Sequence, residues 1–433
     1  MSTPDNSTPT DAHRTEEAGR RTAFAALRHR DFRLLWGGQF FSITGSQMQL
    51  VTINWHVYLL MRPYGEKSAA LALSLVGLVR VLPIIFCSLV GGVVADAVDR
   101  KRLLLITQTV MLACAAVLAF VTAAGLTQIW PIYALTALSS AAIAFDNPAR
   151  QALLPALVPA RDFPNAVSLG FVSFQIALVL GPLLGGVVLA HYGLAVVYAF
   201  NAVSFLAVIA AVLLMRASGK GKAEELARVS LESLKEGLRF VWRTPIMVQT
   251  MSLDFVATFF ASATALLPIF ARDVLHVGER GYGMLAAAAA FGAVLTGLLL
   301  ARRAGGWRRP GLAVLVSVAV YGAATVAFGF SRSYWLSLLM LAVTGAADTV
   351  STVIRQTIRQ LITPDRLRGR MTSVNMIFFM GGPQLGELEA GLVAAALGAP
   401  FSVVLGGLCC IAAVSVTALR ARELLRYRFA QHD

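Results

Sequence analysis

Five charged side chains within long apolar stretches of this 433-residue chain are candidates for chemistry. They are Arg80, Asp254, Asp348, Glu387 and Glu389. A charge is costly inside lipid, so such groups are usually functional. A carboxyl group that faces an apolar cavity can exchange a proton near neutral pH, and an arginine can attract an anion or keep a nearby carboxylate ionised. These residue types predict proton or substrate binding within a membrane. The alternative for each is a packing group whose polar atoms are satisfied by neighbouring helices.

The two aspartates differ in the basic neighbours that their own segments offer. Arg355 follows Asp348 within one or two helical turns and gives it a structural partner. Asp254 has no basic residue within two helical turns. We therefore prefer Asp254 as the proton carrier, with a hydrogen-bonded packing acid as the alternative.

The two glutamates and the arginine lie at different depths and on different faces. Glu387 and Glu389 are two residues apart, so on a helix they point about 200° apart and cannot both face a central pathway squarely. We expect at least one of them to matter for transport. Arg80 lies eleven residues into its apolar segment, roughly 16 Å deep, which makes it the deepest charge. It is predicted to attract an anionic substrate or hold a carboxylate ionised, and the alternative is an arginine bound by helix carbonyls.

Long apolar segments position these side chains. The chain is 57% hydrophobic and 14% charged, with a mean hydropathy of +0.70, outside the range of ordinary soluble domains. Since a bilayer core needs roughly 20 apolar residues per helix, we predict an all-α membrane protein with twelve transmembrane helices. The predicted spans are 34–60, 69–95, 103–125, 130–149, 164–190, 195–215, 246–271, 281–301, 310–330, 333–354, 371–397 and 400–419.

The second half of the chain repeats the first at a constant offset of 205 residues. Arg150-Gln151, Pro159, Arg161, Ser168, Gly181, Gly186 and Gly193 recur as Arg355-Gln356, Pro364, Arg366, Ser373, Gly386, Gly391 and Gly398. Two similar halves of six helices with a site between them are typical of secondary transporters. The repeat fails where Pro182 corresponds to Glu387 and Leu184 to Glu389, and we expect the chemistry at such mismatches.

The net charge of +14 follows the membrane topology. Of the 37 Lys and Arg, five lie in loops on one side and Arg80 lies in a span, whereas the other 31 lie in the tails and in loops on the other side. This asymmetry predicts that both termini are cytoplasmic in the plasma (inner) membrane. A nucleic-acid partner is a poor second interpretation of the charge.

The predicted organisation has five parts. They are a cytosolic tail (1–30), an N-terminal half (31–216), a cytosolic linker with an amphipathic helix (217–245), a C-terminal half (246–421) and a cytosolic tail (422–433). The sequence has no ATP-binding loop, no metal-ligand spacing and no nucleophile elbow. We therefore expect a transporter without enzymatic activity, cofactor or metal. We expect it to be a monomer in a lipid bilayer, to move a small-molecule substrate and to use protons as the coupling ion.

Two motifs contain glycines and charges at a fixed spacing. In the loop after the second span, Gly92 is followed by Asp96 and then by the basic run that begins at Arg100. Asp96 and Arg100 have the spacing of an i,i+4 pair on a helix, and the alternative is that the basic run only sets the topology. The fifth span contains Gly181, Pro182, Gly185 and Gly186. The proline allows a bend and the glycines allow close helix packing.

These motifs resemble those of the major facilitator superfamily over nearly the whole chain. The resemblance implies that Asp96 is the acid of a cytoplasmic gate, with Arg370 at the start of the eleventh span as its partner. This copy has Ala97 in place of a usual basic residue and Asp99 in place of a usual glycine. Gly181 to Gly186 resembles the core of the signature of drug and metabolite antiporters.

Two further segments indicate a branch of the superfamily. Asp31–Trp36 and Phe145–Pro159 resemble the twelve-span drug:proton antiporter branch that contains enterobactin and macrolide exporters. The resemblance implies export of a hydrophobic or amphipathic small molecule (drug, siderophore or metabolite) by proton antiport with alternating access. An uptake carrier or facilitator of the same fold is the alternative, because fold does not set direction. A sensor or scaffold that transports nothing is a more distant one.

Overall fold

The computed structural model describes residues 24–125, 127–217, 239–260, 264–302, 307, 309–364 and 368–420. The side chains of 89–93, 95–97 and 368–381 lie outside this description, although their backbone is helical. The described residues form helices and short connections, without strands. The predicted amphipathic helix of the linker falls largely on residues 218–238, which lie outside the described residues.

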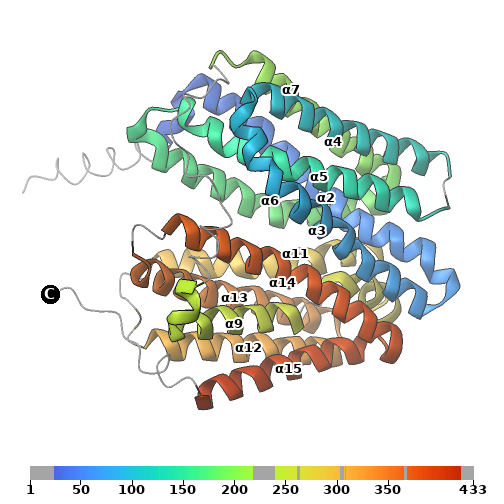
Figure 1. Cartoon of the computed structure of the whole chain (residues 1–433). Coiled ribbons are helices and arrows are strands. Elements are labelled where there is room, and N and C mark those ends of the chain that lie inside the picture. The colour runs from blue at the N-terminus through green and yellow to red at the C-terminus, as the bar shows by residue number, and fades with distance from the viewer. Residues whose placement is uncertain are drawn as a thin grey trace, which may run out of the picture.

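Twelve membrane-spanning segments form two bundles that lie side by side (Figure 1). The N-terminal half consists of α2 (Arg30–Met61), α3 (Glu66–Ala97), α4 (Arg100–Ala123), α5 (Trp130–Leu153), α6 (Phe163–Tyr192) and α7 (Leu194–Leu214). The C-terminal half consists of the seventh span, α11 (Gly278–Ala301), α12 (Pro310–Phe330), α13 (Tyr334–Ile362), α14 (Arg368–Leu397) and α15 (Ala399–Arg420). The predicted fold class is therefore confirmed.

The seventh span is built from several pieces. It begins as α9 (Pro245–Phe260) and continues after the undescribed residues 261–263 as a 3-10 turn (Thr264–Leu266), α10 (Leu267–Ile269) and a π-helix (Phe270–Val274). By length and composition, nine helical segments among the described residues are apolar enough to cross a membrane. The remaining three long helices, α2, α5 and α14, each contain 24 residues or more.

The 205-residue repeat has a three-dimensional counterpart. Gly193 and Gly398 both have a positive φ, +81° and +92°, in the tight connection before the last helix of each half. Gly181 packs against α2 and its counterpart Gly386 against α9, so each closes a contact within its own half. A side chain at these positions would overlap the neighbouring helix, which explains the small residues.

The two halves meet at one end of the bundle. An apolar cluster there combines buried residues of both halves, among them Trp55 and Leu73 of the first half and Phe270 and Tyr282 of the second. Arg62, Gly193 and Gly398 lie in the connections at this end, which we call the sealed end. The opposite end carries the first and last described residues, and we call it the terminal end. The larger apolar clusters described there belong to one half each.

The helices extend beyond the predicted spans, and two expectations change as a result. α13 continues to Ile362, so Arg355, which lies one residue beyond the predicted end of the span at 354, is a buried helical residue. α3 ends at Ala97 and α4 begins at Arg100. Asp96 and Arg100 therefore do not form an i,i+4 pair on one helix. Asp99 caps α4 instead, because its carboxylate accepts the backbone N–H groups of Lys101 and Arg102.

Candidate functional site

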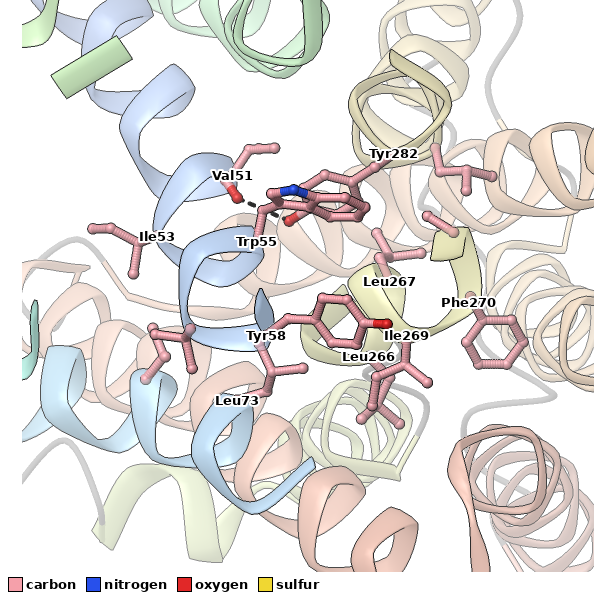
Figure 2. Close-up of a cluster of buried hydrophobic side chains, with 14 of the residues drawn as sticks. Val51, Ile53, Trp55, Tyr58, Leu73, Leu266, Leu267, Ile269, Phe270 and Tyr282 are labelled. Carbon is pink, nitrogen blue, oxygen red and sulfur yellow. Dashed lines mark hydrogen bonds between the residues drawn. The ribbon is translucent and has the colours of Figure 1, made fainter. Parts of the chain in front are cut away.

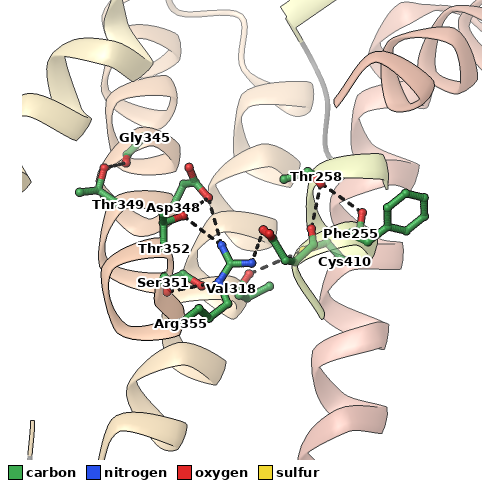
Figure 3. A network of polar contacts seen from close by, with 11 residues as sticks. Phe255, Thr258, Val318, Gly345, Asp348, Thr349, Ser351, Thr352, Arg355 and Cys410 are labelled. Carbon is green, nitrogen blue, oxygen red and sulfur yellow. Dashed lines mark hydrogen bonds and ion pairs between the residues drawn. The ribbon is translucent and has the colours of Figure 1, made fainter. Parts of the chain in front are cut away.

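Arg355 lies at the centre of a charged cluster between α9 and α13. Its guanidinium forms an ion pair with Asp254 of α9, and its Nη2 lies 3.8 Å from Oδ1 of Asp348. Its Nε donates to the carbonyl of Ser351 (3.2 Å) and its Nη2 to the hydroxyl of Thr352 (3.0 Å). Figure 3 shows the guanidinium lying between the helices. The arginine is thus fixed on α13 while it faces two acids.

The three side chains differ in their exposure. The side chain of Arg355 is 9% exposed, that of Asp254 22% and that of Asp348 49%. Asp348 and Arg355 line a small pocket together with Ala257, Thr258, Val318, Tyr321, Ala347 and Ser351. The cluster therefore contains a closely paired acid and a more accessible one around the same arginine.

The repeat-equivalent arginine of the first half is used differently. Arg150 pairs with Asp146 one turn earlier on α5. Asp146 is buried and also accepts hydrogen bonds from Thr107 (2.9 Å) and Gln108 (2.9 Å) of α4. In the second half Ser351 replaces the acid at this position, so Arg355 is available to Asp254. The first half has a structural clamp where the second half has a cluster beside a pocket.

Glu387 lies in a second place, at the contact between the halves. Its carboxylate accepts the hydroxyl of Thr264 at 3.3 Å. A Cβ placed on Gly77 of α3 would lie 2.7 Å from Oε2 of Glu387, so the carboxylate rests directly on the glycine. Arg80 lies three residues after Gly77, one turn further along α3. The structure thus places two of the predicted residues, Arg80 and Glu387, in one group.

Glu389 points elsewhere, as expected from its spacing. Glu387 faces Thr264 and α3, and Glu389, two residues later on the same helix, projects in another direction. The predicted candidates therefore form two groups, Asp254 with Asp348 and Arg80 with Glu387, and Glu389 belongs to neither. Their roles in proton or substrate binding stay predictions.

The sealed end is closed by aromatic and charged contacts between the halves. Trp55 of α2 and Tyr282 of α11 are stacked at 5.1 Å, and the hydroxyl of Tyr282 donates to the carbonyl of Val51 at 3.1 Å (Figure 2). Nε of Arg62 donates to both carboxylate oxygens of Asp273, at 3.1 and 3.2 Å. This bond raises the pKa of Arg62 above its ordinary value, so the guanidinium remains charged.

The glycines of the Gly181-Pro182 motif face two neighbours. Gly181 and Gly185 pack on α2, the former against Gln47 and the latter against Met48. Gly186 packs on Gly283 of α11, in the other half. The motif therefore connects the fifth span both to its own half and to the opposite one, whereas its role as an antiport signature stays a prediction.

The predicted cytoplasmic gate is described only in part. The side chains of Gly92, Asp96 and Arg370 lie outside the described residues. Arg100 is described, and its Nη1 donates to the carbonyl of Ala152 at the end of α5, at 2.8 Å. It thus joins two helices of the first half.

Sequence reasoning missed two members of these groups. Arg355 was considered only as a partner of Asp348, but the repeat held a signal, because Ser351 stands where Asp146 pairs with Arg150. Gly77 gave no signal, because a single glycine in an apolar helix is common and its neighbour comes from a helix about 300 residues away.

The fold and sequence resemble known membrane transporters. Residues 21–426 match the family described as transmembrane secretion effector. A multidrug efflux pump, Tap, of Mycolicibacterium fortuitum is 26% identical over 88% of this chain and 93% of its own length. The enterobactin exporter EntS of Citrobacter koseri is 25% identical over 92% of this chain and 94% of its own.

Solved structures show the same fold at low sequence identity. A bacterial homologue of the human lysosomal transporter Spinster, in an inward-facing and occupied conformation, matches with a TM-score of 0.68. The match has 15% identity and covers 93% of this chain and 99% of the other. A bacterial homologue of the iron transporter ferroportin, in an inward-facing state, gives a TM-score of 0.64 at 14% identity, over 90% and 98% of the two chains. The fold is that of the major facilitator superfamily.

Proposed function

Because the chain belongs to the transmembrane secretion effector family of major facilitator transporters, we propose that it exports a hydrophobic or amphipathic small molecule in exchange for protons. The family consists of transporters and not of enzymes. Export is supported by the two relatives, one a multidrug efflux pump and the other an enterobactin exporter. Drugs, siderophores and metabolites are the substrate classes that we propose for this chain.

The proposed membrane is the inner membrane of a bacterium, with the terminal end in the cytosol. Positive charge is concentrated in the tails and in the loops of that end, as the positive-inside asymmetry requires. In this orientation the sealed end faces outward, and the described structure corresponds to an inward-facing state. A substrate then enters from the cytosol, and rocking of the halves releases it outside. We propose that one chain is sufficient for this cycle.

The observation that carries proton exchange is the ion pair between Asp254 and Arg355. Protonation of Asp254 removes its charge, and the guanidinium of Arg355 then has Asp348 as its remaining acid, 3.8 Å away in the present state. Release of the proton restores the first pair. Proton binding thereby changes which side chains hold α9 and α13 together.

The direction of transport distinguishes export from uptake by the same fold. We expect everted membrane vesicles with an imposed acidic interior to accumulate Hoechst 33342 or ethidium when they contain the protein, because the cytosolic face is then outermost. Right-side-out vesicles should expel these probes.

The control is the same vesicle preparation without an imposed pH difference. Accumulation in right-side-out vesicles would instead identify an uptake carrier. A failure of the protein to move these probes or enterobactin in either orientation would contradict the proposal and favour a sensor or scaffold.

A further inference from the structure

Two aromatic rings form one of the contacts between the halves. Trp55 of α2 and Tyr282 of α11 stack with an angle of 24° between their planes, and each side chain is at most 1% exposed. Tyr58, one turn after Trp55 on α2, packs against the indole at a distance of 5.7 Å between ring centres. Figure 2 shows the indole of Trp55 lying against the ring of Tyr282. The stacked rings belong to different halves, so separation of the halves at the sealed end must part them.

The repeat shows that the two-half architecture does not require this pair of rings. The offset of 205 residues relates Trp55 to Phe260 and Tyr282 to Gly77. Gly77 lies on α3, which crosses α14 as α11 crosses α6. One contact between the halves therefore has a tyrosine where its counterpart has a glycine. The stacked pair is a feature of this contact alone.

Opening of the sealed end leaves each ring without its stacking partner. Tryptophan and tyrosine side chains each have roughly 150–250 Å² of surface to bury, and aromatic rings favour offset stacks with centres about 4.5–7 Å apart. Trp55 and Tyr282 satisfy this preference with each other in the present state. In an open state, a flat aromatic molecule between the two rings restores both stacking contacts at once.

The indole N–H of Trp55 is a second observation that points to a ligand. This group can only donate a hydrogen bond. The side chain is fully buried, and Nε1 has no acceptor among the residues that the structure describes. A buried donor without a partner costs free energy, and such a group in a native structure calls for an explanation. An acceptor atom at the edge of a stacked ligand satisfies this donor.

We propose that Trp55 and Tyr282 form a release site for flat aromatic molecules when the sealed end opens. The molecule lies between the two rings, and an acceptor atom at its edge accepts the N–H of Trp55. This proposal rests on the proposed function in that the sealed end opens during export. It adds the chemical class that this end recognises, which is planar aromatic compounds that carry a hydrogen-bond acceptor.

The shape of a molecule decides whether this site accepts it. A flat ring needs a gap of about 7 Å between the planes of the two side chains, twice the usual contact distance between carbon atoms. Hoechst 33342 is flat, and its benzimidazole nitrogens are acceptors. Tetraphenylphosphonium is also an apolar cation, but its phenyl groups are arranged tetrahedrally and it has no acceptor. The second probe therefore cannot stack on both rings.

Equilibrium binding to the purified protein tests the proposal without a transport assay. Arg62→Gln together with Asp273→Asn removes the ion pair that joins the halves at the sealed end, so the open state becomes more populated. A partly exposed ion pair can change such an equilibrium by up to about fivefold. Apparent affinity rises with the population of the state that binds the ligand. We therefore expect this double variant to bind Hoechst 33342 about fivefold more tightly than the parent in equilibrium dialysis.

Substitutions of the rings in this double variant identify the site. Trp55→Leu and Tyr282→Leu should each abolish the gain in affinity for Hoechst 33342, and Trp55→Phe, which keeps a ring, should retain part of it. Trp335→Leu removes an exposed tryptophan at the start of α13 and is the matched control, which should keep the full gain. The affinity for tetraphenylphosphonium should be the same with and without the ring of Trp55.

Two results would overturn the proposal. One is a gain in Hoechst 33342 affinity that is absent from the start or that survives in Trp55→Leu. The other is an equal effect of Trp55→Leu on both probes, which is the behaviour of rings that only close the sealed end. If Trp55→Leu fails to fold, Tyr282→Leu tests the same site from the other half.

The outcome is separate from that of the proposed function. Binding is measured without a pH difference and without transport, so a protein that fails to export either probe can still show the expected pattern. Conversely, a protein that exports Hoechst 33342 in exchange for protons, but binds it without dependence on Trp55, would refute this inference alone.

Discussion

Arg150 and Arg355 occupy equivalent positions in the repeat and hold different acids. Arg150 binds an acid on its own helix, buried among Thr107 and Gln108, whereas Arg355 binds an acid from another helix beside a pocket. One arginine thus stabilises the fold and its counterpart belongs to the proposed transport site. The difference arises from a single position, Asp146 in one half and Ser351 in the other.

The first prediction concerns this clamp. Asp146→Ala removes the partner of a partly buried arginine and two hydrogen-bond acceptors, so it should destabilise the protein by about 3–5 kcal/mol, as the loss of one partner of a buried pair does. Thermal unfolding in detergent is the measurement. Asp162→Asn, which removes an acid bound to His29 near the surface, is the control and should leave the unfolding temperature nearly unchanged. Equal unfolding temperatures for the two variants would contradict the clamp.

At the level of single residues, the sequence indicated the relative directions of side chains along one helix but not which side chains meet across helices. Glu387 and Glu389 were expected to face different ways, and the structure shows it, since spacing along one helix fixes relative direction. Asp254 was expected to lack a basic neighbour, which holds along its own helix but not in space. Its partner Arg355 comes from a helix about 100 residues later, and spacing along a chain contains no information on such contacts.

Helices that cross closely depend on glycine at a few positions only. Gly186 and Gly391 lie in the two crossings between the halves, while Gly170 on α6 has open space around it. Gly292 and Gly345 make a similar close contact between α11 and α13 within the second half. The small residues of this chain therefore mark particular helix contacts and not helix flexibility in general.

The second prediction follows from this contrast. Gly186→Val places a branched side chain where the backbone of Gly283 lies, and overpacking of this kind costs about 1–3 kcal/mol. We expect probe transport in vesicles to fall by about tenfold, because this contact must move when the halves rock, and a barrier raised by about 1.4 kcal/mol slows a step tenfold. Gly170→Val on the same helix should transport at the parental rate. Similar transport by both variants would show that the crossing tolerates a side chain.

The positions of the helices could be predicted from apolar length, whereas their ends could not. All twelve predicted spans correspond to helical segments, but α13 extends eight residues beyond the predicted end at 354. Its last two turns contain Arg355 and Arg359, which resemble a polar loop in sequence. Helix α13 ends where Pro364 forces Thr363 into an extended conformation. Tertiary partners such as Asp254 allow charged residues to remain in the helix.

At the scale of the whole molecule, side chains of the two halves meet at the sealed end, and the excess of Lys and Arg lies at the terminal end. The stacked Trp55 and Tyr282 and the pair of Arg62 with Asp273 close the sealed end. The large apolar clusters described at the terminal end belong to separate halves. During transport the sealed end must open and the terminal end must close. In the cycle proposed here, proton binding to intramembrane acids supplies the energy for this change. Both acids that we favour, Asp254 and Glu387, have an arginine nearby.

The coupling of proton flow to export is tested most directly with purified protein in liposomes that contain the pH-sensitive dye pyranine. With Hoechst 33342 or ethidium supplied on one side, the parental protein is expected to move protons in the opposite direction to the probe. Asp254→Asn and Glu387→Gln should lose this proton movement, and Asp254→Asn should still exchange labelled for unlabelled probe at equilibrium. Undiminished proton-coupled transport in both variants would contradict the account.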